Sequence, residues 1–157
     1  MASLQIDEQG LLVSCSNCDR KNRIAFGKLG HTARCGNCHQ EIRAAETPLE
    51  VRSTADFDRL VDQSGVPVVV DYWAPWCGPC RMVAPELEKV AKRASDRFLV
   101  VKVNTDALSD LGERHAVRSI PTLAVFAHGR EVTRTAGARP AAEIEAFINA
   151  AIQPVGR

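Results

Sequence analysis

Residues 71–80 read DYWAPWCGPC, and this stretch decides the fold that we predict for the chain. It follows an apolar run, Val68-Val69-Val70, that is typical of a buried strand, and it leads into residues 81–90, RMVAPELEKV, whose pattern predicts a helix. Cys77 and Cys80 are three residues apart at the start of that helix, so we expect both thiols on one face of its first turn, within reach of a disulfide. Unpaired N–H groups and the positive end of the helix dipole stabilise a thiolate there. A dithiol in this position can attack other disulfides.

The two cysteines are expected to have unequal tasks. Cys77 comes first, at the N-terminus of the helix, so we expect it to be the exposed thiolate and the attacking nucleophile. Cys80 lies one turn further in, so we expect it to be more buried and to resolve the mixed disulfide. Gly78 allows a tight entry into the helix, and Pro79 lacks an N–H that would be unpaired in a first turn anyway. Half of a zinc site is the competing interpretation, which the strand-to-helix context disfavours.

Charged residues interrupt two apolar strands close to this pair. A buried Asp71 would have a raised pKa and could relay a proton to or from Cys80, whereas Asp71 is solvated if the strand ends at Val70. Lys102 interrupts the apolar residues 99–103, where it either pairs with Asp71 or extends its ammonium to water from a sheet edge. Position alone is compatible with each of these interpretations.

Aromatic and proline residues suggest a substrate surface beside the cysteines. Trp76 directly precedes Cys77, and we expect it to line that surface. Ile120-Pro121 opens a later strand, where a missing N–H falls outside the ladder. The sequence by itself is compatible with either a cis or a trans peptide bond before Pro121.

From residue 53 onward, helical and strand patterns alternate. We expect helices over residues 54–63, 77–94, 108–115 and 141–152, and strands over residues 66–72, 98–104, 122–126 and 131–134. This order predicts an α/β fold with a mixed central sheet flanked by helices. A proline and a change in composition indicate a linker over residues 45–52. The expected organisation is therefore a small module over residues 1–44 and a domain over residues 53–157.

Composition limits the possible partners and location. A hydrophobic fraction of 45% and a charged fraction of 25% are those of a globular protein, and the net charge of +1 gives no general attraction to nucleic acid or to a membrane. No segment approaches the ~20 apolar residues of a membrane span. The first eight residues carry neither a basic nor an apolar signal region, so we expect a cytoplasmic protein.

All six cysteines fall in C-x-x-C pairs, and the first two pairs predict a metal site. Cys15 and Cys18 are separated by 16 residues from Cys35 and Cys38, a spacing typical of zinc ribbons. Residues 15–42 contain too few large apolar side chains for a core, so a Zn²⁺ ion held by four thiolates would supply folding free energy. Two disulfides, or a second redox pair at Cys35 and Cys38, are the competing interpretations.

Residues 71–80 resemble the active-site segment of thioredoxins, and the similarity extends from about Val51 to the C-terminus. The same resemblance covers Lys102, the Ile120-Pro121-Thr122 segment and Gly137. It implies that Cys77 and Cys80 are the redox cysteines, Asp71 the buried acid and Lys102 its partner. It also implies a cis bond at Pro121, a substrate-groove glycine at Gly137 and backbone hydrogen bonds from Ile120 to an extended substrate.

The whole chain resembles the thioredoxin 2 subclass, which has a four-cysteine zinc module before the redox domain. This resemblance implies a protein disulfide reductase without an organic cofactor, acting on disulfide-containing proteins and recycled by a flavin- and NADPH-dependent thioredoxin reductase. The other function compatible with the sequence is a zinc-dependent module that binds a partner or senses oxidants. We expect no membrane or nucleic-acid partner.

Overall fold

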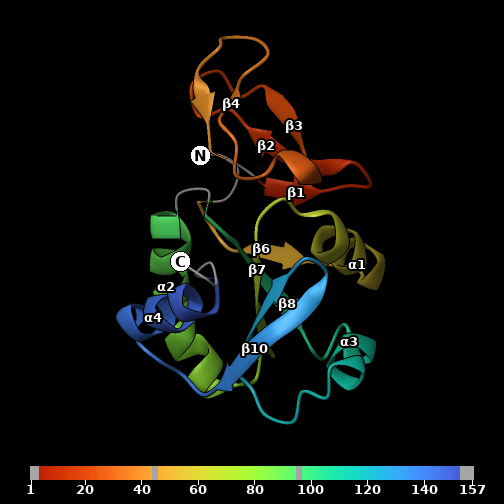
Figure 1. Cartoon of the computed structure of the whole chain (residues 1–157), viewed down its shortest axis with the longest axis vertical. Helices are drawn as coiled ribbons and strands as arrows, with labels where there is room; N and C mark the ends of the chain where they lie inside the picture. Colours follow the sequence, from red (N-terminus) through yellow and green to blue (C-terminus); the bar gives the residue numbers. More distant parts are fainter. Residues whose placement is uncertain (1–3, 44–45, 95–96, 153–157) are drawn as a thin grey trace, which may run out of the picture.

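The structure, a computed structural model that describes residues 4–43, 46–94 and 97–152, is built on a five-stranded mixed sheet (Figure 1). Its strands lie in the order β10-β9-β7-β8-β6. Strands β6 and β7 run parallel to β8, whereas β9 is antiparallel to β7 and β10 is antiparallel to β9. The strand bounds are Leu49–Val51 (β6), Val68–Trp73 (β7), Leu99–Asn104 (β8), Thr122–Ala127 (β9) and Arg130–Ala136 (β10).

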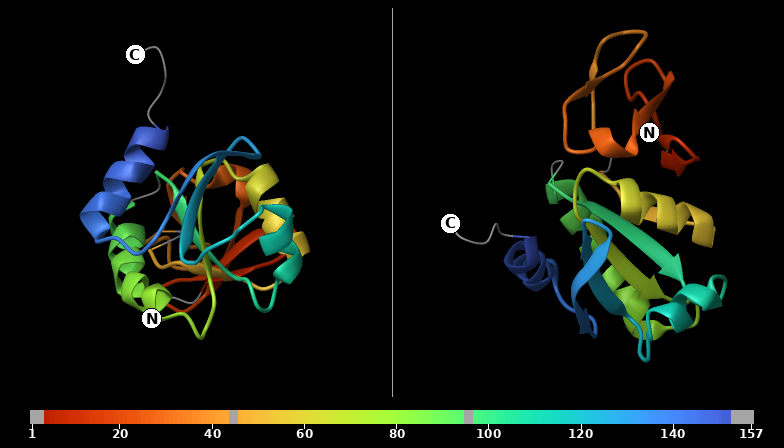
Figure 2. Two further views of the ribbon diagram at one scale, coloured as in Figure 1. Left: turned by 90° about the horizontal axis from the view of Figure 1, so that it is seen from below. Right: turned by 45° about the vertical axis from the view of Figure 1, so that its right-hand side comes forward.

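Helices cover both faces of this sheet, as the alternating pattern predicts (Figure 2). One face carries α1 and α3, and the other carries α2 and α4. Alternation along β7 divides the core: Val70 packs in the cluster that contains α1 and α3 side chains, whereas Val69 packs with side chains of α2 and α4. The helix bounds are Thr54–Gln63 (α1), Gly78–Ala94 (α2), Ser109–Arg114 (α3) and Ala141–Ile152 (α4).

The N-terminal residues form a separate small module of short strands, at the top of Figure 1. Three antiparallel strands are followed by one 3-10 turn and a two-stranded ladder. The bounds are Leu4–Ile6 (β1), Gly10–Ser14 (β2), Lys21–Ala25 (β3), Phe26–Lys28 (η1), Ala33–Arg34 (β4) and Glu41–Ile42 (β5).

This module and the larger domain share one hydrophobic core. Phe26 and Leu29 of the module are buried in the same cluster as Leu60 and Val61 of α1. The N–H of Gly65, just after α1, donates to the carbonyl oxygen of Phe26 at 2.9 Å. A Cβ at Gly65 would lie 2.8 Å from a module carbonyl oxygen, so the close approach requires glycine.

Part of the segment expected to be a linker is a strand. Residues 49–51 form β6, in which Leu49 and Val51 are buried and pair with β8. Three residues are too few for a clear alternating pattern. Because of the preceding proline, we expected the domain to begin at residue 53, which is after the start of β6. Residues 44 and 45, at the expected start of the linker, lie outside the described residues. Among the helices that the structure describes, none is long and apolar enough to cross a membrane.

Candidate functional site

Cys77 and Cys80 are joined by a disulfide at the N-terminus of α2, with their Cα atoms 5.3 Å apart. Cys77 occupies the residue before the helix, where its Sγ accepts a hydrogen bond from the N–H of Cys80 at 3.2 Å. Its carbonyl oxygen accepts from the N–H of Arg81 at 3.3 Å, which closes the first turn. The sulfur therefore lies at the positive end of the helix dipole, as expected from the sequence.

The expected difference in exposure between the two cysteines is wrong for this oxidised state. Cys77 is 3% exposed and Cys80 is 4% exposed. The disulfide holds both sulfurs against Ala74 and Ile120, and this contact covers Cys77. By contrast, Trp76, Gly78 and Pro79 are exposed around the pair.

The loop before β9 faces the disulfide. Its Ile120–Pro121 peptide bond is cis, and the Ile120 carbonyl oxygen lies 3.8 Å from Cys77 Sγ. Gly137, at the end of β10, has a φ of 102° and donates its N–H to the carbonyl oxygen of Pro121 at 2.9 Å. Ile120, Pro121 and Gly137 are thus brought together beside Cys77 although they are far from it in the sequence.

A groove of about 200 Å³ lies next to Ile120. Trp76 is 66% exposed and forms one wall, with its indole N–H donating to Asp106 at 3.3 Å. The complete lining consists of Trp76, Thr105, Gly112, Val117, Arg118, Ser119 and Ile120. Because Trp76 directly precedes Cys77, the groove offers a partly apolar surface next to this cysteine to a bound polypeptide.

Asp71 is buried, with 1% of its surface exposed, so the solvated interpretation is wrong. Among the described residues, its Oδ1 atom has no hydrogen-bond partner. Burial raises the pKa of Asp71 to about 7, and the nearby Lys102 ammonium opposes this rise. Such a carboxyl group can exchange a proton close to neutral pH.

Lys102 is not at a sheet edge, because β8 lies between β7 and β6. It is directly opposite Asp71 in the register of β7 and β8. Its ammonium lies 4.6 Å from the ring centroid of Trp73, a cation–π geometry.

The arrangement along β7 places Asp71 beneath the first half of α2. Alternation puts Asp71 on the same face as Val69 and Trp73. Val69 packs in a cluster with Val83 of α2, and Trp73 packs against the two cysteines.

Glu50 is a polar residue of this site that the sequence interpretation missed, because it lay inside the expected linker. In the structure it is on β6, directly opposite Lys102. The indole N–H of Trp73 donates to its Oε2 at 3.4 Å. The local signal for this strand is the alternation of buried and polar positions in Leu49-Glu50-Val51, which is too short to indicate a strand by itself.

The other four cysteines form a tight cluster in the module. Sγ of Cys15 lies 3.7 Å from that of Cys38, and Sγ of Cys18 lies 3.6 Å from that of Cys35. All four sulfurs are within 4.8 Å of one another, and none is in a disulfide. Four ligands at the Zn–S length of about 2.3 Å on a tetrahedron are about 3.8 Å apart, so the cluster fits a single tetrahedral ion.

Two similar turns hold these sulfurs. The N–H of Asn17 donates to Cys15 Sγ and the N–H of Asn37 donates to Cys35 Sγ, both at 3.4 Å. The N–H of Cys38 is the main cause that lowers the pKa of the Cys35 thiol to about 6. Such N–H groups favour thiolates, the form that binds a metal. His31 and His39 are exposed and do not belong to the cluster.

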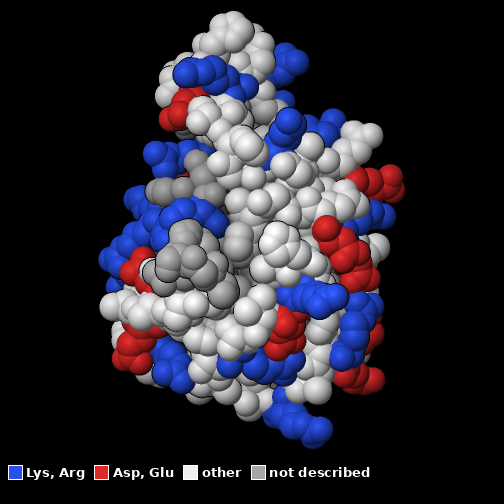
Figure 3. Space-filling view, in the orientation of Figure 1, with Lys and Arg blue, Asp and Glu red and all other residues white. Residues whose placement is uncertain are grey.

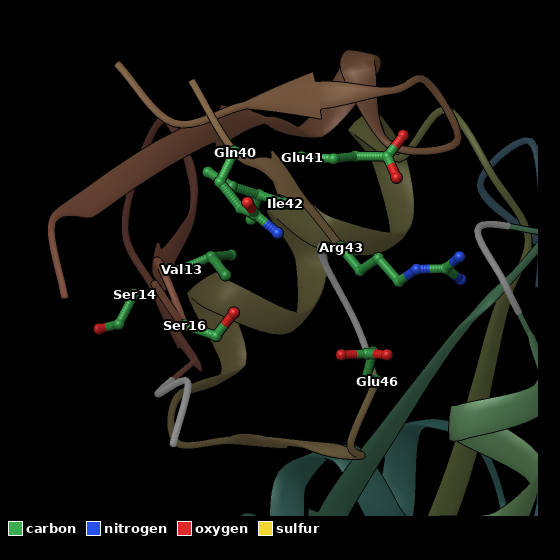
Figure 4. Close-up of a pocket in the computed structure, with 8 residues that line it drawn as sticks. All are labelled: Val13, Ser14, Ser16, Gln40, Glu41, Ile42, Arg43 and Glu46. Atoms are coloured by element: carbon green, nitrogen blue, oxygen red, sulfur yellow. The ribbon is translucent and has the colours of Figure 1, made fainter. Parts of the chain in front are cut away.

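A polar cavity in the module and the distribution of surface charge are two further features of the surface. A polar cavity of about 240 Å³ lies between β2 and β5 (Figure 4), and its lining residues are Val13, Ser14, Ser16, Gln40, Glu41, Ile42, Arg43 and Glu46. Acidic and basic side chains are interspersed over the face shown in Figure 3, in keeping with a net charge of +1.

The sequence and the fold were compared with those of known proteins. Residues 48–150 match the family model described as Thioredoxin. "Thioredoxin C-3" of Corynebacterium nephridii is 36% identical over 143 residues, which cover 91% of this chain and 97% of that protein. "Thioredoxin 1" of Synechococcus elongatus is 50% identical over 86 residues, covering 55% of this chain and 80% of that protein. A solved mutant thioredoxin from Halobacterium salinarum superposes with a TM-score of 0.64 at 29% identity, covering 70% of this chain and 95% of that one.

Proposed function

Because the chain belongs to the thioredoxin family and is a thiol–disulfide oxidoreductase, we propose that it reduces protein disulfides with the Cys77–Cys80 pair. The observation that carries the proposal is the bond between these two sulfurs at the N-terminus of α2, beside the Ile120 carbonyl oxygen. In the reduced protein the same helix end favours a Cys77 thiolate, which is the attacking form.

In the first step, the Cys77 thiolate attacks one sulfur of a substrate disulfide. A bond forms between Cys77 Sγ and that sulfur, and the substrate S–S bond breaks. The second substrate sulfur leaves as a thiolate and takes a proton from solvent. The product is a mixed disulfide between the substrate and Cys77.

In the second step, Cys80 loses its proton and attacks Cys77 Sγ. We assign the proton acceptor to Asp71, whose burial beneath α2 and pKa of about 7 suit that role. The mixed disulfide breaks, the remaining substrate sulfur leaves as a thiolate, and Cys77 and Cys80 become joined. The substrate has then gained two electrons, and the pair is in the oxidised state of this structure.

The substrate is proposed to lie as an extended segment across Trp76, Ile120, Pro121 and Gly137. Trp76 offers an exposed ring, and Ile120 offers backbone groups next to the reacting sulfur. Gly78 and Pro79 stay exposed beside the disulfide, so a second chain can approach it.

The module over residues 1–44 is proposed to hold one Zn²⁺ ion through Cys15, Cys18, Cys35 and Cys38. Four thiolates complete a tetrahedral site and leave no open position, so the ion's contribution is structural. The redox domain completes the proposed organisation, and we place its start at β6, Leu49–Val51, which belongs to the central sheet, in place of the expected start at residue 53. Together with the match to a relative over 91% of the chain, this favours the thioredoxin 2 subclass.

The oxidised pair must be reduced again after each turnover. We propose a flavin- and NADPH-dependent thioredoxin reductase as the electron donor, and disulfide-containing proteins as substrates, with no organic cofactor on this chain. Four unbonded cysteines in the module suit a reducing compartment, so we propose the cytoplasm.

Insulin reduction tests the assignment. Cys77→Ser is expected to abolish turnover with dithiothreitol or a reductase as donor, since the attacking sulfur is lost and the Cys77–Cys80 disulfide cannot form. Cys80→Ser is its matched partner: it should still attack and should accumulate a mixed disulfide, which intact-mass measurement detects. Turnover that survives in Cys77→Ser would exclude this mechanism.

A further inference from the structure

Three charged side chains form a row across three neighbouring strands of the sheet. Glu50 on β6 is opposite Lys102 on β8, and Lys102 is opposite Asp71 on β7. Residues directly opposite one another in neighbouring strands point to the same face, so all three lie on the α2 side. One ammonium group is therefore placed between two carboxyl groups.

The indole of Trp73 contacts two members of this row, Glu50 and Lys102. Its N–H donates to Glu50 Oε2 at 3.4 Å, and its ring lies 4.6 Å from the Lys102 ammonium. Trp73 also packs against Cys77 and Cys80. A change at Glu50 is thus transmitted both to the lysine beside Asp71 and to the ring beside the disulfide.

Few other charges act on this row within the described part of the chain. Lys102 and Glu50 are the two charged groups that influence Asp71, and they act in opposite directions. Burial raises the pKa of Glu50, whereas the hydrogen bond from Trp73 and the charges of Lys102 and Arg52 oppose that rise. The neighbouring strand β9 places Leu123 opposite Asp71.

The overlying helix adds one further titratable group. The side chains of α2 that are buried toward this face include Cys80, Val83 and Leu87. Of these, only Cys80 titrates, and only when the disulfide is reduced. The state of Asp71 is therefore governed by burial, by Lys102 and by Glu50.

We propose that Glu50 is a positioning residue for disulfide exchange. It holds Lys102 and Trp73 in place and partly neutralises the positive charge of Lys102, so that Asp71 can accept and return a proton near neutral pH. This inference rests on the proposed role of Asp71 as the proton acceptor for Cys80. Without the Glu50 charge, the lysine would favour the ionised form of Asp71 alone, and the carboxylate would be a weaker base.

The size of the effect follows from the sheet geometry. Neighbouring strands are about 4.8 Å apart, so Glu50 and Asp71 are separated by about 10 Å across β8. At the effective dielectric of a protein, one charge at that distance shifts a titration by about half a unit to one unit. Glu50→Gln keeps a hydrogen-bond acceptor for Trp73 and removes only the charge.

The experiment is a carbon-13 NMR titration of the Asp71 carboxyl in the oxidised protein, together with the pH profile of insulin reduction. Glu50→Gln is expected to move the Asp71 midpoint downward by about half a unit to one unit, and the pH profile in the same direction. Glu50→Asp should restore most of the wild-type midpoint. Glu88→Gln, the same substitution at an exposed site on α2, should leave it unchanged.

The possible outcomes separate the inference from the function on which it rests. An Asp71 midpoint that is the same in Glu50→Gln and wild type would overturn the role of Glu50, even if insulin is reduced normally. A shifted midpoint with an unshifted pH profile would overturn the role of Asp71 as proton acceptor, and with it this inference. Parallel shifts that are reversed in Glu50→Asp support both.

Discussion

Replacing Asp71 with asparagine is expected to stabilise the folded protein, and more so at high pH. The wild-type carboxyl is 1% exposed, and its pKa is about 7 in the folded chain against 3.8 for the ordinary side chain. The folded state therefore binds the proton more tightly than the unfolded state does. Asparagine has nearly the same shape and carries no charge at any pH.

The sign follows from proton linkage. Below pH 3.8 the carboxyl is protonated in both states, so ionisation costs nothing. Between pH 3.8 and 7 it ionises only on unfolding, which favours the unfolded state increasingly as the pH rises. Above pH 7 the full cost is present, since the folded state must then hold a buried carboxylate.

The magnitude follows from the two pKa values, at 1.36 kcal/mol for each unit of difference. Relative to wild type, Asp71→Asn should gain about 4 kcal/mol in free energy of unfolding at pH 8. The gain should fall to about 2 kcal/mol at pH 5 and to nearly zero at pH 3.

Guanidinium unfolding of the oxidised proteins at these pH values measures the difference. Asp62→Asn, which removes a carboxylate from an exposed position of α1, is the matched control and should show little difference at any pH. A gain for Asp71→Asn that is independent of pH, or a loss of stability at pH 8, would refute the burial argument.

Three further predictions concern other parts of the molecule. Cys35→Ser should reduce bound zinc to a small fraction of one ion per chain and lower the melting temperature, as metal analysis and calorimetry would show. Phe26→Ala should destabilise the whole chain by about 3–5 kcal/mol in a single unfolding transition, because Phe26 is 2% exposed in the core shared by module and domain; two separate transitions would argue against a shared core. Trp76→Ala should raise KM for insulin several-fold while leaving the unfolding midpoint unchanged, because the ring is 66% exposed.

The α/β fold was predictable because its signals are local. The apolar run before Asp71 and the alternation of helices and strands depend on neighbours in the sequence. The start of α1 is also a local feature, because the Ser53 side chain accepts a hydrogen bond from the N–H of Asp56 at 3.1 Å. The bounds expected for α1 and α4 agree with those observed.

Features that depend on strand register were harder to predict from the sequence. Asp71 and Lys102 lie opposite each other only because β7 and β8 pair in one particular register. The positions of the two residues in the sequence do not determine that register. Glu50 was overlooked because β6 is only three residues long and gains its strand structure from pairing with β8. Local propensity carries little information about so short a strand.

Features that depend on packing between distant segments could not be read from the pattern. The burial of Cys77 results from its disulfide and from the contact with Ile120, a residue of a remote loop. The shared core arises because Phe26 and Leu29 of the module find an apolar surface on α1. The sequence of the module predicted no core of its own, because its apolar side chains are buried only together with those of the larger domain.

The central claim is that one cysteine pair carries out redox chemistry and the other four hold a metal. Thiol counting in denaturant with a chelator, combined with metal analysis of the native protein and disulfide mapping by mass spectrometry, tests it directly. We expect six free thiols in the reduced protein, four in the oxidised protein, one zinc in both, and a single disulfide between Cys77 and Cys80. A protein without metal, or a disulfide among Cys15, Cys18, Cys35 and Cys38 in its place, would contradict the claim.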